Sequence, residues 1–221
     1  MASARDLSGA VVAVVGADGG LGHEITTVLE RRGATVVRCT RSGGPGSDVT
    51  LDMRDARAGD ALVDHVDATH GRLDGVIVAA GIVAFGDLVD TDDVVIEELF
   101  LTNAMGPMWL AKRVAPALRE SQGFFVNVSG VVAEAPMPGM AAYSASKAAA
   151  ASATEAIRRE FRRMKVAVID VRPPHTETGL ATRPLAGDAP KMPTGLEPAA
   201  VAERIVAAIE QGDAAVASTD F

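Results

Sequence analysis

Tyr143 and Lys147 stand four residues apart in the segment Tyr-Ser-Ala-Ser-Lys, and Ser129 precedes the tyrosine by fourteen residues. On a helix, residues four apart lie on the same face, about one turn from each other. A phenol with a pKa near ~10 is a weak base at neutral pH, and a neighbouring ammonium favours its ionised form. Ser129 would donate a hydrogen bond to a carbonyl or alkoxide oxygen. These residue types at this spacing predict proton transfer to or from a carbinol oxygen.

A glycine-rich turn near the N-terminus could bind a phosphate group. Residues 10–15 form an apolar, β-branched run without alternation, which is typical of a strand buried on both faces. A helical stretch follows the turn, and the free N–H groups and dipole at a helix N-terminus favour an anion. The alternative is a flexible turn that binds nothing. The phosphate interpretation assigns cofactor contacts to Gly16, Asp18, Gly20, Leu21 and Gly22.

Together these motifs resemble the short-chain dehydrogenase/reductase family. The glycine spacing Gly-x3-Gly-x-Gly, Ser129 within Asn-Val-Ser-Gly, and Tyr143-x3-Lys147 match that family's order and separations over residues 8 to about 210. The resemblance implies an NAD(P)-dependent oxidoreductase that interconverts a ketone or aldehyde and an alcohol. It also implies a catalytic tetrad of Asn103, Ser129, Tyr143 and Lys147, in which Lys147 lowers the tyrosine pKa and holds the nicotinamide ribose.

The resemblance also assigns further cofactor contacts. Asp52 and Met53 match the family's adenine contact; Asp52 could instead cap a helix starting at Arg54, and both could hold. Ala80 and Gly81 end a segment in which two side-chain amides common in the family are replaced here. The remaining contacts are Tyr143, Lys147, Pro173, Thr176 and Thr178. For the two threonines the alternative is ordinary turn hydroxyls.

Asn103 is followed by a proline that changes the backbone chemistry around it. In a helix, the N–H of residue 107 would bond to the carbonyl of residue 103, but Pro107 has no N–H. The Asn103 carbonyl is therefore expected to be free and the helix to kink locally. The resemblance implies that this carbonyl holds a water linking Lys147 to solvent. The alternative is a kink that only shapes helix packing.

The end of the second predicted strand bears on the choice between NADP(H) and NAD(H). An acidic residue there would accept hydrogen bonds from the ribose 2′-OH, whereas an arginine would pair with a 2′-phosphate. Thr40 stands where the acid would be expected, and Arg41 follows it. NADP(H) is therefore favoured over NAD(H). Against this, Gly19 stands where NADP-preferring relatives often carry Arg or Lys.

Strand-like and helix-like runs alternate along the chain. Strands are predicted near 10–15, 34–39, 49–51, 75–80, 123–128, 165–171 and 214–217, and helices near 20–32, 54–70, 92–119, 142–164 and 198–211. This alternation predicts an α/β fold, a Rossmann-like doubly wound parallel sheet in three layers. A glycine-rich loop over 41–47 replaces the helix that the family usually has after its second strand. We expect one dinucleotide-binding and catalytic domain over residues 1–221.

Composition narrows the possible partners and the compartment. The net charge of -8 argues against nucleic acid or an anionic membrane as partner. The single cysteine cannot form an internal disulfide, and the N-terminus has no apolar leader, so a cytoplasmic protein is expected. The four histidines lack ligand spacing, so no metal site is expected. By resemblance, the helices at 92–119 and 142–164 build a homodimer or homotetramer.

The expected partner is a small carbonyl or alcohol substrate. Leu180, Leu185 and Met192 in the loop 179–195, together with Met137 and Met140, indicate an apolar substrate. Arg183 and Lys191 could instead meet an acidic group or be solvated charges. His175 could face the substrate or lie solvated on its loop. The alternative function is a non-catalytic dinucleotide-binding regulatory or scaffold protein, although the intact tetrad favours an enzyme.

Overall fold

A seven-stranded parallel sheet forms the centre of the computed structural model, which describes residues 5–221. Its strand order is β3-β2-β1-β4-β5-β6-β7. The strands are β1 (Val11–Val15), β2 (Thr35–Thr40), β3 (Val49–Thr50), β4 (Gly75–Val78), β5 (Phe124–Val128), β6 (Ala167–Val171) and β7 (Ala215–Val216). This order confirms the predicted doubly wound Rossmann-like fold.

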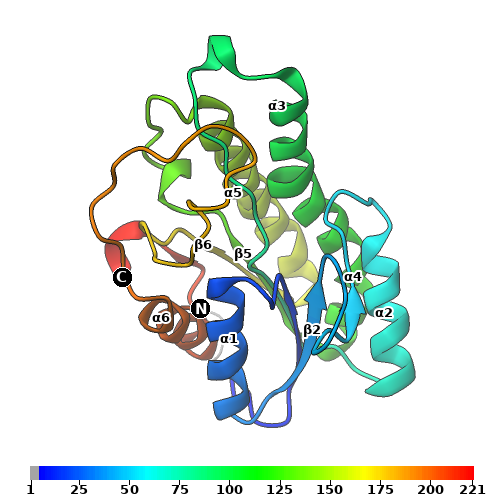
Figure 1. The fold of residues 1–221 in the computed structure, drawn as a ribbon. Coiled ribbons are helices and arrows are strands. Elements are labelled where there is room, and N and C mark those ends of the chain that lie inside the picture. Colours follow the sequence, from blue (N-terminus) through cyan, green and yellow to red (C-terminus); the bar gives the residue numbers. More distant parts are fainter. Residues whose placement is uncertain (1–4) are drawn as a thin grey trace.

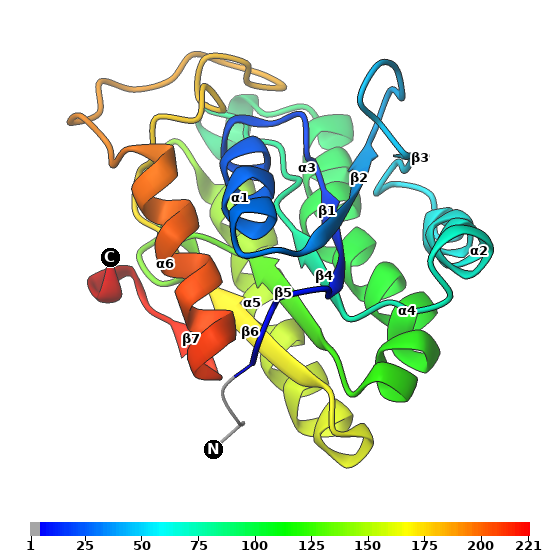
Figure 2. The same cartoon turned by 90° about the horizontal axis from the view of Figure 1, so that it is seen from below.

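Helices cover both faces of the sheet (Figures 1 and 2). The helices are α1 (Gly20–Arg31), α2 (Ala58–Thr69), α3 (Asp93–Phe100), α4 (Gly106–Ser121), α5 (Ala141–Phe161) and α6 (Pro198–Gln211). Helices α1 and α6 lie together on one face, while α2, α4 and α5 lie on the other. Because successive strand residues point to opposite faces, β1 supplies Val12 and Val14 to one core and Val11, Ala13 and Val15 to the other.

The strand order changes direction beside β1, and this switch point determines where the site lies. β1 pairs with β2 on one side and with β4 on the other. The connections from these strands leave in opposite directions, which opens a crevice at the carboxyl ends of the strands. The predicted glycine turn directly follows β1 and leads into α1 (Figure 2).

The predicted helix at 92–119 is divided by a local irregularity. Between α3 and α4 the chain forms a π-helical turn, Leu101–Met105, which the Gly106 N–H closes on the Leu101 carbonyl. The wider turn lies where Pro107 cannot donate, and such turns accommodate an interrupted helical hydrogen-bond ladder. The irregularity therefore lies where the sequence predicted a local kink, and it takes the form of a widened helical turn.

One boundary differs from the prediction, and one expectation about a loop is confirmed. The helix expected from residue 54 begins at Ala58, so Asp52 is not its N-cap; the residue at that position is Arg57. No helix lies between β2 and β3, where Thr40 Oγ1 donates to Ser47 Oγ at 2.8 Å across the glycine-rich loop.

Within residues 5–221, no helix combines the length and the apolar character needed to cross a membrane.

Candidate active site

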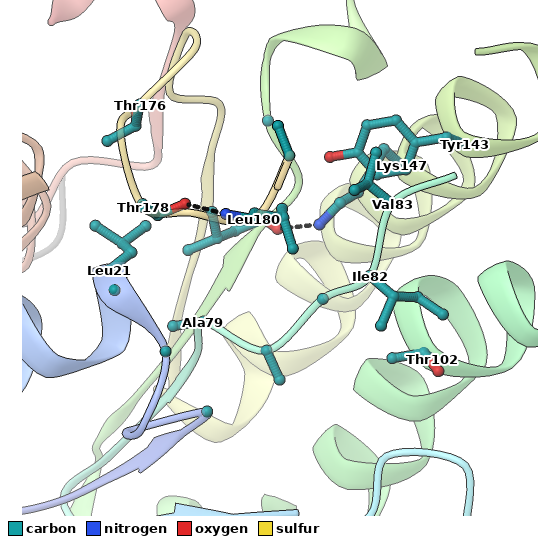
Figure 3. A pocket seen from close by; sticks show the side chains of 18 of the residues that line it. Leu21, Ala79, Ile82, Val83, Thr102, Tyr143, Lys147, Thr176, Thr178 and Leu180 are labelled. Carbon is teal, nitrogen blue, oxygen red and sulfur yellow. Dashed lines mark hydrogen bonds between the residues drawn. The ribbon is translucent and has the colours of Figure 1, made fainter. Parts of the chain in front are cut away.

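A cavity of about 460 Å³ lies at the carboxyl ends of the central strands. It extends from the glycine turn after β1 to the segments that follow β4, β5 and β6 (Figure 3). Most of the residues selected from the sequence line it: Gly16, Asp18, Gly20, Leu21, Arg41, Asp52, Met53, Ala80, Gly81, Ser129, Tyr143, Lys147, Pro173, Thr176 and Thr178. Gly22 and Asn103 do not line it, and each has a different structural position, described below.

The glycine turn is packed so tightly that side chains would not fit. Gly16 has a φ of +84°, and a Cβ on Gly22 would lie 2.0 Å from the Gly16 carbonyl oxygen. A Cβ on Gly20 would lie 2.5 Å from the carbonyl oxygen of Thr178, on the loop after β6. The first turn of α1 carries no acidic side chain. This cradle fits the pyrophosphate of a dinucleotide, because free N–H groups and the helix dipole favour an anion there.

Tyr143 and Lys147 project from the first turns of α5 into the cavity (Figure 3). Lys147 Nζ donates a hydrogen bond to the Val128 carbonyl at 3.0 Å. Burial lowers the pKa of Lys147 to about 8, while the nearby Asp170 carboxylate acts in the opposite direction.

Tyr143 differs from the prediction in one respect. Its ring packs against an apolar cluster that includes Val83, Phe85 and Met140, and this burial raises the pKa of Tyr143 to about 12. The sequence predicted that Lys147 would lower it. The prediction was wrong for the direction of the shift, because burial disfavours the charged phenolate.

Ser129 lies directly after β5 and is fully buried. Its Oγ donates a hydrogen bond to Oδ1 of Asp170 at 2.7 Å. Asp170 lies on β6, the next strand of the sheet, and was not selected from the sequence. A lone carboxylate within the otherwise apolar strand residues Val168, Ile169 and Val171 was the available signal.

The Asn103 side chain supports the cavity wall. Its amide group donates to the Ile82 carbonyl at 2.9 Å and to Ser146 Oγ at 3.0 Å, and its oxygen accepts the Ile82 N–H at 2.9 Å. Ile82 lines the cavity, whereas Asn103 is buried behind it. Asn103 thereby holds the backbone after β4 in place, and a proton relay through its carbonyl stays a prediction.

Charged side chains gather at the opposite end of the cavity. Arg54 forms an ion pair with Asp52 at 2.6 Å and another with Glu98 at 3.2 Å, and its hydrogen bond with Asp52 holds the pKa of that carboxyl below its usual range. Arg41 lines this end and, among residues 5–221, has no acidic partner within ion-pair distance. Arg38 lies outside the cavity and pairs with Glu30.

The wall beside Tyr143 is apolar and comes from three separate segments. Val83 and Phe85 follow β4, Val132 and Met140 precede α5, and Leu180 and Met192 belong to the loop before α6. The segments after β4 and β6 are joined by hydrogen bonds from Leu185 N to the Val83 carbonyl at 2.7 Å and from Phe85 N to the Ala186 carbonyl at 2.9 Å.

Of the other residues predicted near this wall, some line the cavity and some lie outside it. His175 and Arg183 line the cavity, and His175 lies 3.4 Å from Glu177. Leu185 and Lys191 do not line it. This position does not fit a substrate contact by Leu185, whereas for Lys191, which is exposed, it agrees with the alternative of a solvated charge. Val83, Phe85 and Val132 were missed, because apolar loop residues carry no motif. Among the described residues, no group of three or more His, Cys, Asp or Glu side chains could hold a metal ion.

Comparison with known proteins agrees with this geometry. The family model described as short chain dehydrogenase matches residues 10–187. Dehydrogenase/reductase SDR family member 7B of Bos taurus is 30% identical over 228 residues, covering 90% of this chain and 70% of the relative. The 11-beta-hydroxysteroid dehydrogenase A of Sesamum indicum is 30% identical over 173 residues, covering 71% of this chain and 50% of that relative. This chain thus spans only half of the second relative's length.

A solved structure matches almost the whole chain. It is the crystal structure of a short chain dehydrogenase from Burkholderia cenocepacia J2315 in complex with NADP, with a TM-score of 0.85 and 27% identity, covering 97% of this chain and 90% of the other. The match includes the strands that carry the glycine turn and the tyrosine helix. On the family model and on this likeness, the chain belongs to the short-chain dehydrogenase/reductase family and is an NAD(P)-dependent oxidoreductase.

Proposed function

We propose that this protein is an NADP(H)-dependent oxidoreductase that interconverts an apolar ketone or aldehyde and the corresponding alcohol. One observation carries the proposal: Ser129, Tyr143 and Lys147 line the same cavity as the glycine turn, next to an apolar wall. A proton donor, a cation and a hydroxyl beside a dinucleotide cradle suit hydride transfer coupled to proton transfer.

The nicotinamide, when bound, would supply or accept the hydride. Tyr143, whose pKa is about 12, carries its proton at neutral pH and would give it to the oxygen of the carbonyl being reduced. Lys147 would hold the nicotinamide ribose and stabilise the phenolate left behind, since its ammonium is the charged form below a pH of about 8. Ser129 would hydrogen-bond the same substrate oxygen.

Two features support NADP(H) over NAD(H). No carboxylate stands at the end of β2, where one would repel a 2′-phosphate. Arg41 follows that strand at the cavity wall, and among residues 5–221 its guanidinium has no ion-pair partner, unlike those of Arg38 and Arg54. A guanidinium without a carboxylate partner is available for a bidentate phosphate contact.

The apolar wall supports the substrate class. Val83, Phe85 and Met140 are buried, and Tyr143, Leu180 and Met192 pack against them. Apolar and flexible side chains favour a hydrophobic substrate of moderate size. One similar protein is named as a hydroxysteroid dehydrogenase, and a steroid is a largely apolar molecule.

The assembly proposed for this chain is a homodimer or homotetramer through α4 and α5. Met105, directly before α4, and Met108, in its first turn, are 36% and 39% exposed, so this region presents apolar side chains to its surroundings. Light scattering at micromolar concentration tests this, and a monomer mass would contradict it.

The function is tested by following loss of NADPH absorbance with a panel of carbonyl compounds. We expect turnover of apolar ketones or aldehydes, more slowly with NADH than with NADPH, and turnover reduced by at least ~10²-fold in the Tyr143→Phe variant. Preference for small anionic carbonyl compounds would contradict the substrate class. NADPH binding by fluorescence titration without oxidation by any compound of the panel would favour a non-catalytic dinucleotide-binding protein.

A further inference from the structure

Asp170 is a buried carboxylate immediately behind the proposed catalytic serine. It is 6% exposed and lies on β6 in register with Asn127 of β5. A buried carboxylate is costly unless it is paired, hydrogen-bonded or protonated. Burial raises the pKa of Asp170, although Ser129, Arg172 and Lys147 each act in the opposite direction. If this position on the buried strand served packing alone, an apolar side chain would be expected there.

The single proton of the Ser129 hydroxyl is engaged by this carboxylate. Ser129 Oγ donates to Asp170 Oδ1 at 2.7 Å, and the Val171 carbonyl lies 3.4 Å from the same oxygen. A hydroxyl has one proton to donate. While Asp170 is ionised, it competes with a substrate oxygen for that proton. Once Asp170 is protonated, it can donate to Ser129 Oγ, and the serine proton becomes available to the substrate.

The second oxygen of Asp170 is held by a cation. Oδ2 lies 2.8 Å from Arg172 Nε, and Arg172 in turn pairs with Glu134, which accepts a hydrogen bond from Ser218 at 2.8 Å. The two carboxyl oxygens thus have different partners, a guanidinium on one side and the serine hydroxyl on the other. The guanidinium fixes the orientation, so a proton on Asp170 belongs on Oδ1, facing Ser129.

We propose that Asp170 is a positioning residue that controls the direction of the Ser129 hydrogen bond, and that the form active in carbonyl reduction is the protonated one. This inference rests on the proposed function. In that form Asp170 donates to Ser129 Oγ from Oδ1, and Ser129 donates to the oxygen of the substrate, where negative charge develops as the hydride arrives. No proton is consumed at Asp170, because the proton that ends on the alcohol comes from Tyr143.

The other groups around Asp170 are compatible with such control. Lys147 approaches from α5, and Arg172, which pairs with Glu134, follows Asp170 directly after the end of β6. On β7 the register partner is Ala215, which carries no charge. The two cations favour the carboxylate and burial favours the acid, so a substrate or a change of pH can shift the balance.

The variant Asp170→Asn distinguishes this role from a structural one. Its amide is expected to turn the oxygen to Arg172 and the NH₂ to Ser129, because the guanidinium repels an N–H donor. The amide then imitates the protonated acid at every pH. With the apolar ketone that the wild type reduces best, the wild-type kcat should fall as pH rises through the Asp170 pKa, whereas the kcat of Asp170→Asn should not fall there. Asp170→Leu should lose roughly 10-fold or more in kcat at all pH values, since Ser129 loses its orientation.

Loss of kcat in Asp170→Asn with an unchanged pH profile would overturn the proposal. NADPH affinity and melting temperature, measured for each variant, should match the wild type and so separate misfolding from loss of positioning. Absence of turnover by the wild type itself would contradict the proposed function, a failure distinct from this one.

A measurement independent of turnover and of the asparagine variant addresses the same point. The Asp170 carboxyl pKa can be followed by ¹³C NMR of protein labelled in its aspartate carboxyl groups, the signal being assigned by its absence in Asp170→Leu. We expect a pKa above the ordinary aspartate range, and a higher one in Ser129→Ala, because the serine hydrogen bond favours the carboxylate. An ordinary pKa, unchanged in Ser129→Ala, would show that Asp170 stays ionised and would overturn the proposal.

Discussion

The two ends of the cavity hold charge in different ways. At the end formed by β2 and the residues after β3, the guanidinium of Arg54 is partly exposed, with its side chain 43% accessible, and it pairs with Asp52 and Glu98. At the end formed by β5, β6 and α5, the ionisable groups Lys147 and Asp170 are buried and Tyr143 is half-buried. Exposed ion pairs are screened by water and shift stability little, whereas buried groups have strongly shifted pKa values.

The difference indicates that the two ends of the cavity have separate roles. The exposed end can bind a charged nucleotide without a large cost, because its cations remain hydrated until the ligand arrives. The groups at the buried end are shielded from water. A small change of charge on a substrate oxygen therefore changes its electrostatic interaction energy with these groups strongly. We expect substitutions at the buried end to act mainly on kcat, and those at the exposed end mainly on cofactor affinity.

The largest effect is expected from Tyr143→Phe. The phenol is the proposed proton donor, and general acid–base catalysis contributes roughly 10²–10⁴-fold to a rate. The variant should lose at least ~10²-fold in kcat and keep its affinity for NADPH, because Phe preserves the apolar contacts with Val83 and Met140. Steady-state kinetics and a fluorescence titration measure the two quantities. Near-wild-type turnover would remove Tyr143 from the mechanism.

A smaller effect, confined to binding, is expected from Arg41→Ala. A charged hydrogen bond contributes roughly 1.5–3 kcal/mol, which corresponds to about 10- to 150-fold in affinity. NADPH binding should weaken by that factor while NADH binding changes little. Arg38→Ala is the matched control, since Arg38 comes from the same strand but pairs with Glu30 outside the cavity. Equal losses for the two cofactors would show that Arg41 does not contact the 2′-phosphate.

The exposed end was more predictable from the sequence than the buried end. The glycine turn, Arg41 and Asp52 lie within or directly after short local motifs, and the alternation of strands and helices predicted the sheet that brings them together. A turn with a positive φ needs glycine whatever surrounds it, so its sequence carries the information.

The buried end depends on contacts between segments distant in the sequence. Asp170 meets Ser129 only because β5 and β6 are neighbours in a given register. Val83 and Phe85 form a wall because the loop before α6 bonds to them. The pKa of Tyr143 rises for the same reason: the local Tyr-x-x-x-Lys motif predicts a lowered value, whereas burial by those distant segments decides the outcome.

Leu180→Ala tests the substrate wall. Leu180 lines the cavity and packs against the apolar cluster of Val83, Phe85 and Met140, as does Tyr143. Loss of its side chain removes apolar contact area worth at most ~2 kcal/mol, so KM for the apolar substrate should rise by roughly 3- to 10-fold with little change in kcat. Leu185→Ala is the control, because Leu185 is 44% exposed and lies outside the cavity. Equal KM values in the two variants would contradict an apolar contact at Leu180.

The last expected effect is on stability and not on kinetics, and it comes from the buried charge of Lys147. Its pKa is about 8 in the folded protein against an ordinary 10.5, so between these values the unfolded chain binds more protons than the folded one. Stability from this group therefore rises as pH increases across that window.

The melting temperature of Lys147→Met should lack this rise, while the exposed Lys191→Met variant should keep the wild-type pH dependence. The comparison is made between proteins at each pH, because Cys39, whose pKa burial raises to about 12, contributes a change of opposite sign to all of them. An identical dependence in Lys147→Met and the wild type would mean that this end of the cavity is hydrated, and the contrast between the two ends would then not hold.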